Sequence, residues 1–171
     1  MKIGNIEEGF RLLVDKPAGM SSFGVVARVR RILSEKSGKK KVKVGHTGTL
    51  DPFATGLLVL MVGKETKKCG ELMGLDKRYE ATVRLGAFST TGDVEGEIEE
   101  TKITEDMIPD REKVEEVVVG FLGESMQKVP IFSAVKINGR RAYDLARRGE
   151  EVETPTRKIM IYELRDRKSV V

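Results

Sequence analysis

Hydrophobic residues recur along the chain with two different periods, which predict helices in some segments and strands in others. Apolar residues at every third or fourth position predict a helix that begins at an N-cap, Ser21 or Ser22, and runs to about Leu33. An unbroken apolar run from Leu57 to Val62 predicts a strand buried on both faces. Strict alternation of apolar and polar residues from Arg78 to Leu85 predicts a strand with one apolar face.

Shorter segments with the same periods fill the rest of the chain, and glycine or proline bounds most of them. The other predicted strands are Phe10–Val14, Ser133–Ile137 and Arg157–Arg165, and the other predicted helices are Lys64–Met73, Pro109–Val119 and Arg141–Arg148. Loops are expected at the lysine-rich segment 34–43 and at the segment 45–52, which is rich in small residues. Because strands and helices interleave without repeats, the pattern predicts a mixed class, either α/β or α+β.

The composition excludes several classes of protein. A chain of 171 residues with 39% hydrophobic residues can fold as about one domain around a core. A single cysteine, Cys69, cannot form an internal disulfide, and a single histidine, His46, excludes metal sites and proton relays that need two histidines. The longest apolar run falls far short of the roughly 20 residues that span a membrane. The N-terminus lacks the apolar core of a secretory signal, so a cytoplasmic location is expected.

The net charge of +4 hides an uneven distribution of charge. The segment from Asp93 to Glu124 holds 12 acidic and 3 basic residues, which leaves 28 basic and 15 acidic residues in the rest of the chain. Basic clusters beside an acidic segment indicate a polyanionic partner such as a nucleic acid. The alternative is the ion-pair-rich surface of a protein from a thermophile, which the scarcity of side-chain amides also fits.

The segment from Gly45 to Gly56 has the residue types of a ligand-binding loop. Its glycines and threonines allow a phosphate or a sugar to approach the backbone N–H groups closely. Asp51 follows them, and Pro52 biases the backbone of the aspartate towards an extended conformation. The aspartate is therefore a candidate catalytic group on a stiffened loop. Alternatively it only caps a turn, and turn statistics alone favour that interpretation.

Several segments, in order along the chain, closely resemble motifs of one enzyme family. The segment Gly-His-Thr-Gly-Thr-Leu-Asp-Pro-Phe-Ala-Thr-Gly at 45–56 is similar to the catalytic motif of the TruB family of bacterial tRNA pseudouridine synthases. The others resemble the family's Lys-Pro motif at 15–22, its Gly-Glu-x-Thr-Lys and Lys-Arg-Tyr elements at 63–67 and 77–79, and its thumb segment at 130–149. The resemblance extends from about residue 10 to residue 165.

The resemblance implies a fold, a reaction and a substrate. The fold would be α+β, with a mixed and largely antiparallel sheet flanked by helices. Residues 1–171 would form part of the catalytic domain, including a thumb-like RNA-binding insertion at about 127–155. The reaction would flip out the T-loop uridine of tRNA, uridine-55, and isomerise it to pseudouridine. Because the reaction is redox-neutral and involves no hydrolysis, no metal and no cofactor is implied. The partner would be the T-arm of tRNA, and no membrane is implied.

The resemblance also assigns roles to individual residues. Asp51 would be the nucleophile. Tyr79 would stack on the uracil and help to remove its C5 proton, and Lys67 would pair with the aspartate and keep it ionised. From the residues alone, a core position for Tyr79 and a solvated surface position for Lys67 are favoured. His46 would occupy the space that the flipped base leaves. The remaining RNA-binding residues would be Thr47, Gly48 and Thr49 in the loop, and Lys136, Arg140, Arg141, Arg147 and Arg148 in the thumb.

The chain lacks one element that the resemblance implies. Family members continue with a Ser-x-Gly-Thr-Tyr-x-Arg segment whose arginine pairs with the aspartate, and the sequence from Arg165 onwards does not match it. We therefore expect a C-terminally incomplete catalytic domain with little or no turnover alone, the arginine coming from a missing C-terminal segment or a second chain. Two other functions stay open: a non-catalytic RNA-binding or tRNA-folding module, and a dyskerin-type synthase that acts on guided RNA.

Overall fold

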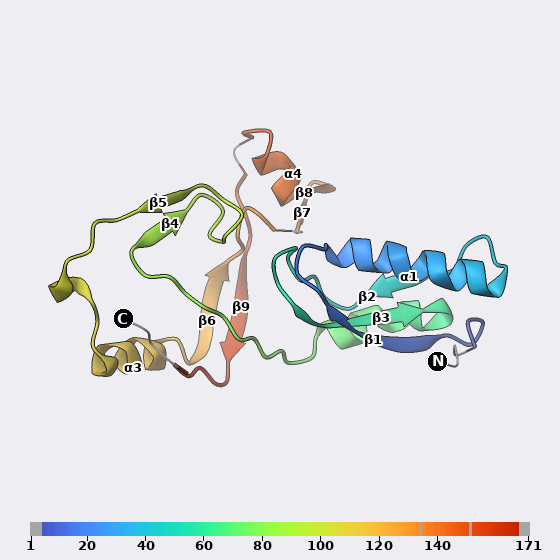
Figure 1. Cartoon of the computed structure of the whole chain (residues 1–171), viewed down its shortest axis with the longest axis horizontal. Coiled ribbons are helices and arrows are strands. Elements are labelled where there is room, and N and C mark those ends of the chain that lie inside the picture. Colours follow the sequence, from blue (N-terminus) through green and yellow to red (C-terminus); the bar gives the residue numbers. More distant parts are fainter. Residues whose placement is uncertain (1–4, 134, 151, 168–171) are drawn as a thin grey trace. The chain divides into compact units, whose positions relative to one another are not determined.

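Three antiparallel strands covered by one long helix form the core of the first half of the chain (Figure 1). The computed structural model describes residues 5–133, 135–150 and 152–167, and the chain divides into two compact units, residues 1–83 and 84–171. β3 lies at the centre of the sheet, between β1 and β2. The elements of the first unit are β1 (Phe10–Lys16), α1 (Ser22–Ser37), β2 (Val44–His46), β3 (Gly56–Val62), the 3₁₀ helix η1 (Gly63–Lys68) and α2 (Cys69–Met73).

β1 and β2 pair with opposite edges of β3. β1 pairs with β3 from Phe10 opposite Val62 to Lys16 opposite Gly56, so the strand predicted at 10–14 is confirmed and is longer. β2 pairs with the other edge of β3 and ends with His46 opposite Leu60. Part of the segment expected as a loop at 45–52 is therefore strand, because its backbone groups complete the hydrogen bonds of β3.

Helix α1 begins and ends at residues that favour helix termini. Ser21 is the N-cap, and its side chain accepts a hydrogen bond from the Gly24 N–H at 3.0 Å. Gly38 ends the helix with a φ of +67°. The helix continues past its predicted end at Leu33, because the next four residues include neither glycine nor proline, and the first part of the expected lysine-rich loop is helical. No helix in the described ranges is both long and apolar enough to cross a membrane.

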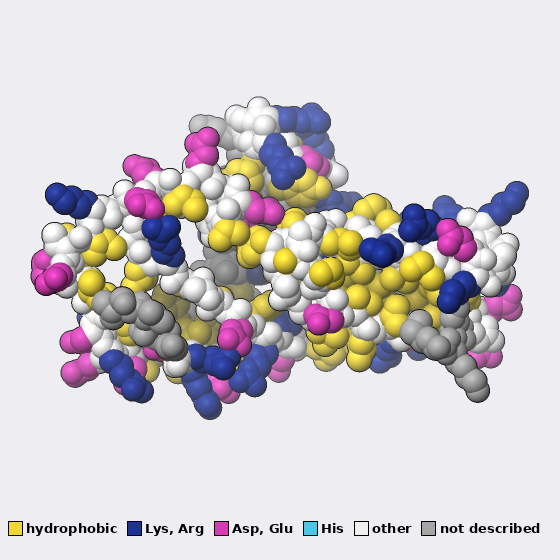
Figure 2. All heavy atoms as spheres, in the orientation of Figure 1, with side chains coloured by type: hydrophobic (Ala, Val, Ile, Leu, Met, Phe, Trp, Pro, Cys, Tyr) yellow, Lys and Arg dark blue, Asp and Glu magenta, His cyan; other side chains and the backbone are white. Residues whose placement is uncertain are grey.

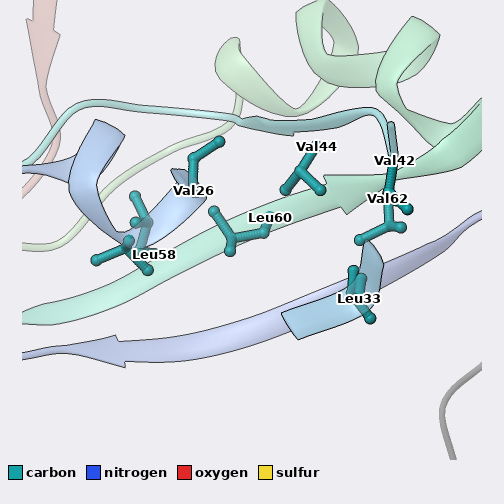
Figure 3. Packing of buried hydrophobic residues seen from close by; sticks show 8 residues of the cluster. Val26, Leu33, Val42, Val44, Leu58, Leu60 and Val62 are labelled. Atoms are coloured by element: carbon teal, nitrogen blue, oxygen red, sulfur yellow. The ribbon is translucent and has the colours of Figure 1, made fainter. Parts of the chain in front are cut away.

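The hydrophobic core of the first unit lies between α1 and the sheet (Figure 3). Its buried cluster consists of Val25, Val26, Leu33, Val42, Val44, Leu58, Leu60 and Val62. The prediction that the run 57–62 is buried on both faces is wrong at its start, where Leu57 is 64% exposed. Successive residues of a strand point to opposite faces, and α1 covers the face that carries Leu58 and Leu60.

Two predicted elements that follow β3 differ in the structure. The helix predicted at 64–73 is divided into η1 and α2, with Gly74 as the final C-cap. The strand predicted at 78–85 is wrong: these residues have no regular secondary structure, and Tyr79 and Val83 are 70% and 77% exposed. A strand needs a partner for its backbone hydrogen bonds, and among the described residues no strand pairs with this segment.

Short antiparallel strand pairs organise the second unit. Its elements are β4 (Ala87–Ser89), β5 (Ile98–Glu100), the 3₁₀ helix η2 (Glu105–Met107), α3 (Arg111–Gly120), β6 (Gly123–Lys128), β7 (Lys136–Ile137), β8 (Arg140–Arg141), α4 (Ala142–Ala146) and β9 (Thr156–Ile161). β4 pairs with β5, β6 with β9, and β7 with β8. The antiparallel pairing and the interleaved helices of the two units confirm the α+β class.

Turn and cap residues set the ends of several elements of the second unit. Asp110 caps α3 by accepting a hydrogen bond from the Lys113 N–H at 2.8 Å. Asn138 and Gly139 form the tight turn between β7 and β8, with φ of +50° and +82°. The predicted elements at 133–137, 141–148 and 157–165 are shortened to β7, α4 and β9. For β9 the reason is its partner, since all six of its residues pair with the six residues of β6.

Candidate active site

The loop between β2 and β3 presents Asp51 to solvent. The loop joins two paired strands, and the Thr47 N–H donates to the Val59 carbonyl at 3.1 Å, which extends the pairing into the loop. The Asp51 side chain is exposed, and the Asp51 carbonyl accepts a hydrogen bond from the Ala54 N–H at 3.1 Å. Within the part of the chain that the structure describes, the carboxylate itself accepts no hydrogen bond, so it does not act as a turn cap. A ligand can therefore reach it.

Ser22 holds the residue before Asp51. It is the first residue of α1 and is 2% exposed. Its hydroxyl donates to the Leu50 carbonyl at 2.9 Å and accepts from the Leu50 N–H at 2.9 Å. The Leu50 side chain packs against the hydrophobic core. Both the backbone and the side chain of Leu50 are thus tied to the first unit.

Lys16 holds the residue after the aspartate, Pro52. It is the last residue of β1 and is fully buried, with 0% exposed. Its Nζ donates to the carbonyls of Pro17 at 2.9 Å, Met20 at 2.7 Å and Pro52 at 3.2 Å. The Gly19 N–H donates to the same Pro52 carbonyl at 2.8 Å. The buried ammonium is tolerated because three carbonyl oxygens accept its three N–H donors.

The other predicted residues of the loop lie in different environments. His46 ends β2 and is partly buried, and its Nδ1 is buried with no hydrogen-bond partner among the described residues. Thr47 is buried, Gly48 is partly buried and Thr49 is exposed. Of this set, Thr49 is the residue most accessible to a ligand. Across the described ranges, no group of three or more His, Cys, Asp and Glu residues is arranged to hold a metal ion.

Lys67 and Tyr79 lie outside the loop. Lys67 is exposed in η1, and Tyr79 is exposed in the irregular segment that follows α2. Between described residues, no hydrogen bond or ion pair joins either of them to Asp51. Their catalytic roles therefore stay predictions.

Glu65 anchors the 3₁₀ helix that carries Lys67. Its carboxylate accepts a hydrogen bond from Arg11 Nε of β1 at 3.1 Å and forms an ion pair with Lys68. The hydrogen bond from Lys68, followed by that from Arg11, lowers the pKa of Glu65 below its ordinary value. The helix η1 is thereby tied to β1, and Lys67 belongs to an ordered segment.

The predicted thumb lies within the second unit, between the end of β6 and the start of β9. Lys128 pairs with Thr156, and the Val129 N–H donates to the Pro155 carbonyl at 3.0 Å, which closes the base of the excursion. Figure 2 shows lysine and arginine side chains gathered over α4 and its hairpin. The thumb-like insertion at about 127–155 and its binding of RNA both stay predictions.

The basic residues predicted to bind RNA are all exposed, but some already have partners. They are Lys136, Arg140, Arg141, Arg147 and Arg148. Arg140 forms an ion pair with Glu150 at 3.0 Å, so a phosphate has to compete with that carboxylate. The Arg147 guanidinium lies 5.7 Å from the centre of the Tyr143 ring, which orients it and leaves its charge at the surface.

Sequence reasoning missed the contacts of Lys16 and Ser22. The resemblance at 15–22 drew attention to the segment, but neither residue type signals these contacts. A serine before an apolar helical stripe is expected to cap the helix, and a lysine at the end of a strand is expected to be solvated. A buried lysine in particular has no signature in a single sequence.

A family model and several curated relatives match the chain. The model described as TruB family pseudouridylate synthase (N terminal domain) matches residues 30–169. The tRNA pseudouridine synthase B of Phocaeicola vulgatus is 46% identical over 160 residues, which are 94% of this chain and 67% of the relative. The protein of the same name from Flavobacterium johnsoniae is 48% identical over 157 residues, 91% of this chain and 68% of the relative. That of Caulobacter vibrioides is 46% identical over 164 residues, 96% of this chain and 50% of the relative.

The chain thus spans between half and about two thirds of the length of these relatives. The family model includes Asp51, Lys67 and Tyr79, and the relatives cover nearly all of the chain. On these matches, the chain belongs to the TruB family of pseudouridylate synthases.

Proposed function

We propose that this chain is an RNA pseudouridine synthase that isomerises uridine-55 in the T-loop of tRNA, with Asp51 as the nucleophile. The family and the name of the relatives, tRNA pseudouridine synthase B, support the reaction class and the substrate. The observation that carries the proposal is the exposed Asp51 carboxylate between two backbone positions that Ser22 and Lys16 hold. An accessible carboxylate on a restrained loop is what nucleophilic catalysis needs. A tRNA substrate also agrees with the expected cytoplasmic location.

The proposed reaction rearranges bonds within one nucleotide. The glycosidic bond between N1 and C1′ breaks, the base turns, and a new bond joins C5 to C1′. C5 loses a proton and N1 gains one, so atoms and electrons balance without an oxidant, a reductant or water. Asp51 stabilises or captures the electron-poor C1′ while the base is detached. Addition of the carboxylate to the base instead of the sugar would satisfy the same balance.

Three further residues complete the proposed site. Tyr79 stacks on the uracil and assists the loss of the C5 proton after the base has left the tRNA stack. Lys67 pairs with the carboxylate and keeps it ionised. His46 fills the space that the base leaves. Among the described residues no hydrogen bond or ion pair joins Lys67 to Asp51, so the proposed pairing forms when RNA binds.

Conversion of uridine-55 is the direct test of this function. Because little turnover is expected of this chain alone, an unmodified tRNA transcript is incubated with excess protein and with the C-terminal segment of a relative added in trans. Pseudouridine is then located by carbodiimide labelling and reverse transcription. We expect a stop one nucleotide to the 3′ side of position 55 and none when cytidine replaces that uridine. Binding without conversion would favour the non-catalytic RNA-binding or tRNA-folding module. Conversion only with a guide RNA would favour the dyskerin type.

Binding of tRNA is expected to weaken steeply as the salt concentration rises, because lysines and arginines that bind phosphates displace counterions. The double substitution Arg147→Glu and Arg148→Glu should weaken binding of T-arm RNA at least about tenfold, and it should reduce the slope of log affinity against log salt by about two. Fluorescence anisotropy at several salt concentrations measures both quantities.

The control for this prediction is Lys102→Glu, which reverses an exposed charge inside the acidic segment. It should leave both the affinity and the salt slope close to those of the parent. Two results would contradict this prediction: affinity that does not depend on salt, or a loss of affinity per reversed charge that is as large in the control as in the double variant. Either would show that the uneven charge distribution plays no part in RNA recognition.

A further inference from the structure

We propose that Ser22 is a positioning residue for the nucleophile, and that its hydroxyl sets the backbone conformation from which the Asp51 carboxylate is presented. The inference rests on the proposed function, because it assigns to Ser22 a role in the reaction of Asp51. It concerns a residue that does not touch the substrate and acts through Leu50.

The first observation is that one buried hydroxyl serves both backbone groups of a single residue. Ser22 Oγ donates to the Leu50 carbonyl and accepts from the Leu50 N–H, both at 2.9 Å. A serine hydroxyl has one proton to donate, so the donation to Leu50 uses its whole donor capacity. With Ser22 only 2% exposed, a water molecule could replace the hydroxyl only if the site opened. Leu50 is thus fixed in both position and orientation.

The second observation is that hydrogen bonds from two different elements hold the residues on either side of Asp51. On one side Ser22 of α1 binds Leu50, and on the other side Lys16 of β1 binds the Pro52 carbonyl at 3.2 Å. The aspartate backbone is therefore restrained from a helix and from a strand, while its carboxylate stays exposed. A displacement of about 1 Å in a reacting group can cost on the order of a hundredfold in rate. Loss of one restraint should therefore slow the reaction without removing the nucleophile.

The third observation is that the neighbouring serine has a different task. Ser21 caps α1 by accepting a hydrogen bond from the Gly24 N–H at 3.0 Å, and no bond between described residues joins its side chain to the loop. Ser21→Ala therefore removes a hydroxyl from the same end of the same helix and leaves the contact to Leu50 intact. The chain itself offers a matched control for the effect of helix stability.

The experiment compares the full chain with Ser22→Ala, Ser21→Ala and Ser22→Thr, the last of which keeps the hydroxyl. The C-terminal segment of a relative is added in trans wherever conversion is measured. Hydrogen exchange of the Leu50 amide reports the contact directly, and single-turnover conversion of tRNA reports the rate constant and the half-saturating protein concentration. For Ser22→Ala we expect Leu50 to exchange at least about tenfold faster and the rate constant to fall about ten- to a hundredfold, with the half-saturating concentration unchanged. Ser21→Ala should change neither Leu50 exchange nor the rate constant by more than about threefold. Ser22→Thr should recover most of both losses.

Two results would overturn the inference: parental exchange and rate in Ser22→Ala, or equal losses in Ser22→Ala and Ser21→Ala, which would indicate helix stability alone. A lower affinity with an unchanged rate constant would also contradict it, because positioning acts on the chemical step. The proposed function fails differently. If Asp51→Asn retains the parental rate, Asp51 is not the nucleophile, whatever the exchange of Leu50 shows about the contact to Ser22.

Discussion

Asp51→Asn is expected to abolish conversion of uridine while binding of tRNA largely survives. Asparagine keeps the shape of the side chain and loses the negative charge that the nucleophile needs. The single-turnover rate constant should fall at least about a thousandfold, which corresponds to roughly 4 kcal/mol in the barrier. Single-turnover conversion of tRNA, with the C-terminal segment of a relative added in trans to parent and variant alike, measures the rate. Fluorescence anisotropy measures binding.

Asp15→Asn provides the matched control, because Asp15 is an exposed aspartate of β1 on the same unit. It should leave the rate close to that of the parent, which separates loss of the nucleophile from loss of one negative charge. The assignment of Asp51 would be wrong if Asp51→Asn retained a rate within about tenfold of the parent, a difference of roughly 1.4 kcal/mol or less.

Lys16→Met is expected to destabilise the first unit. Methionine matches the length of the lysine stem but donates no hydrogen bond, so the carbonyls of Pro17 and Met20 lose the Nζ that they bind at 2.9 and 2.7 Å. A hydrogen bond from a charged group contributes about 1.5–3 kcal/mol, and we expect the free energy of unfolding to fall by about 3 kcal/mol. Urea denaturation followed by circular dichroism measures it.

The Pro52 carbonyl keeps its hydrogen bond from the Gly19 N–H in this variant, so the loop is loosened and not released. Lys41→Met is the control, because it makes the same chemical change at an exposed lysine and should shift the free energy of unfolding by no more than about 0.5 kcal/mol. Equal effects of the two substitutions would show that the three carbonyl contacts of Lys16 contribute nothing to stability.

The elements that could be predicted are those whose burial leaves an apolar pattern in the sequence. α1 and β3 both pack into a shared core, which appears as recurring apolar positions in α1 and as an unbroken apolar run in β3. β6 was not predicted, since Gly-Glu-Ser-Met-Gln-Lys has no such period and its formation depends on pairing with β9, far along the chain. The segment 78–85 shows the converse, because it has the period of a strand and forms none.

The candidate site was predictable as a motif but not as a geometry. The resemblance identified the loop and its aspartate. In the structure, the Asp51 side chain on this loop is exposed to solvent. Nothing in the order of residues indicates that Ser22 and Lys16 reach the two sides of this aspartate. Those contacts depend on how β1 and α1 pack against the hairpin of β2 and β3, and a single sequence does not specify that packing at the level of individual atoms.

The two contacts that flank the aspartate also join distant parts of the chain. Lys16 and Pro52 are 36 positions apart, and Ser22 and Leu50 are 28 positions apart. Each contact requires the closure of a long loop of chain, which the surrounding strands and helix must first make favourable. A nascent or partly unfolded chain therefore contains every residue of the motif and still lacks the site. The rate of tRNA conversion would therefore depend on the fraction of molecules in which the first unit is folded. The chain would be inactive until that unit has folded.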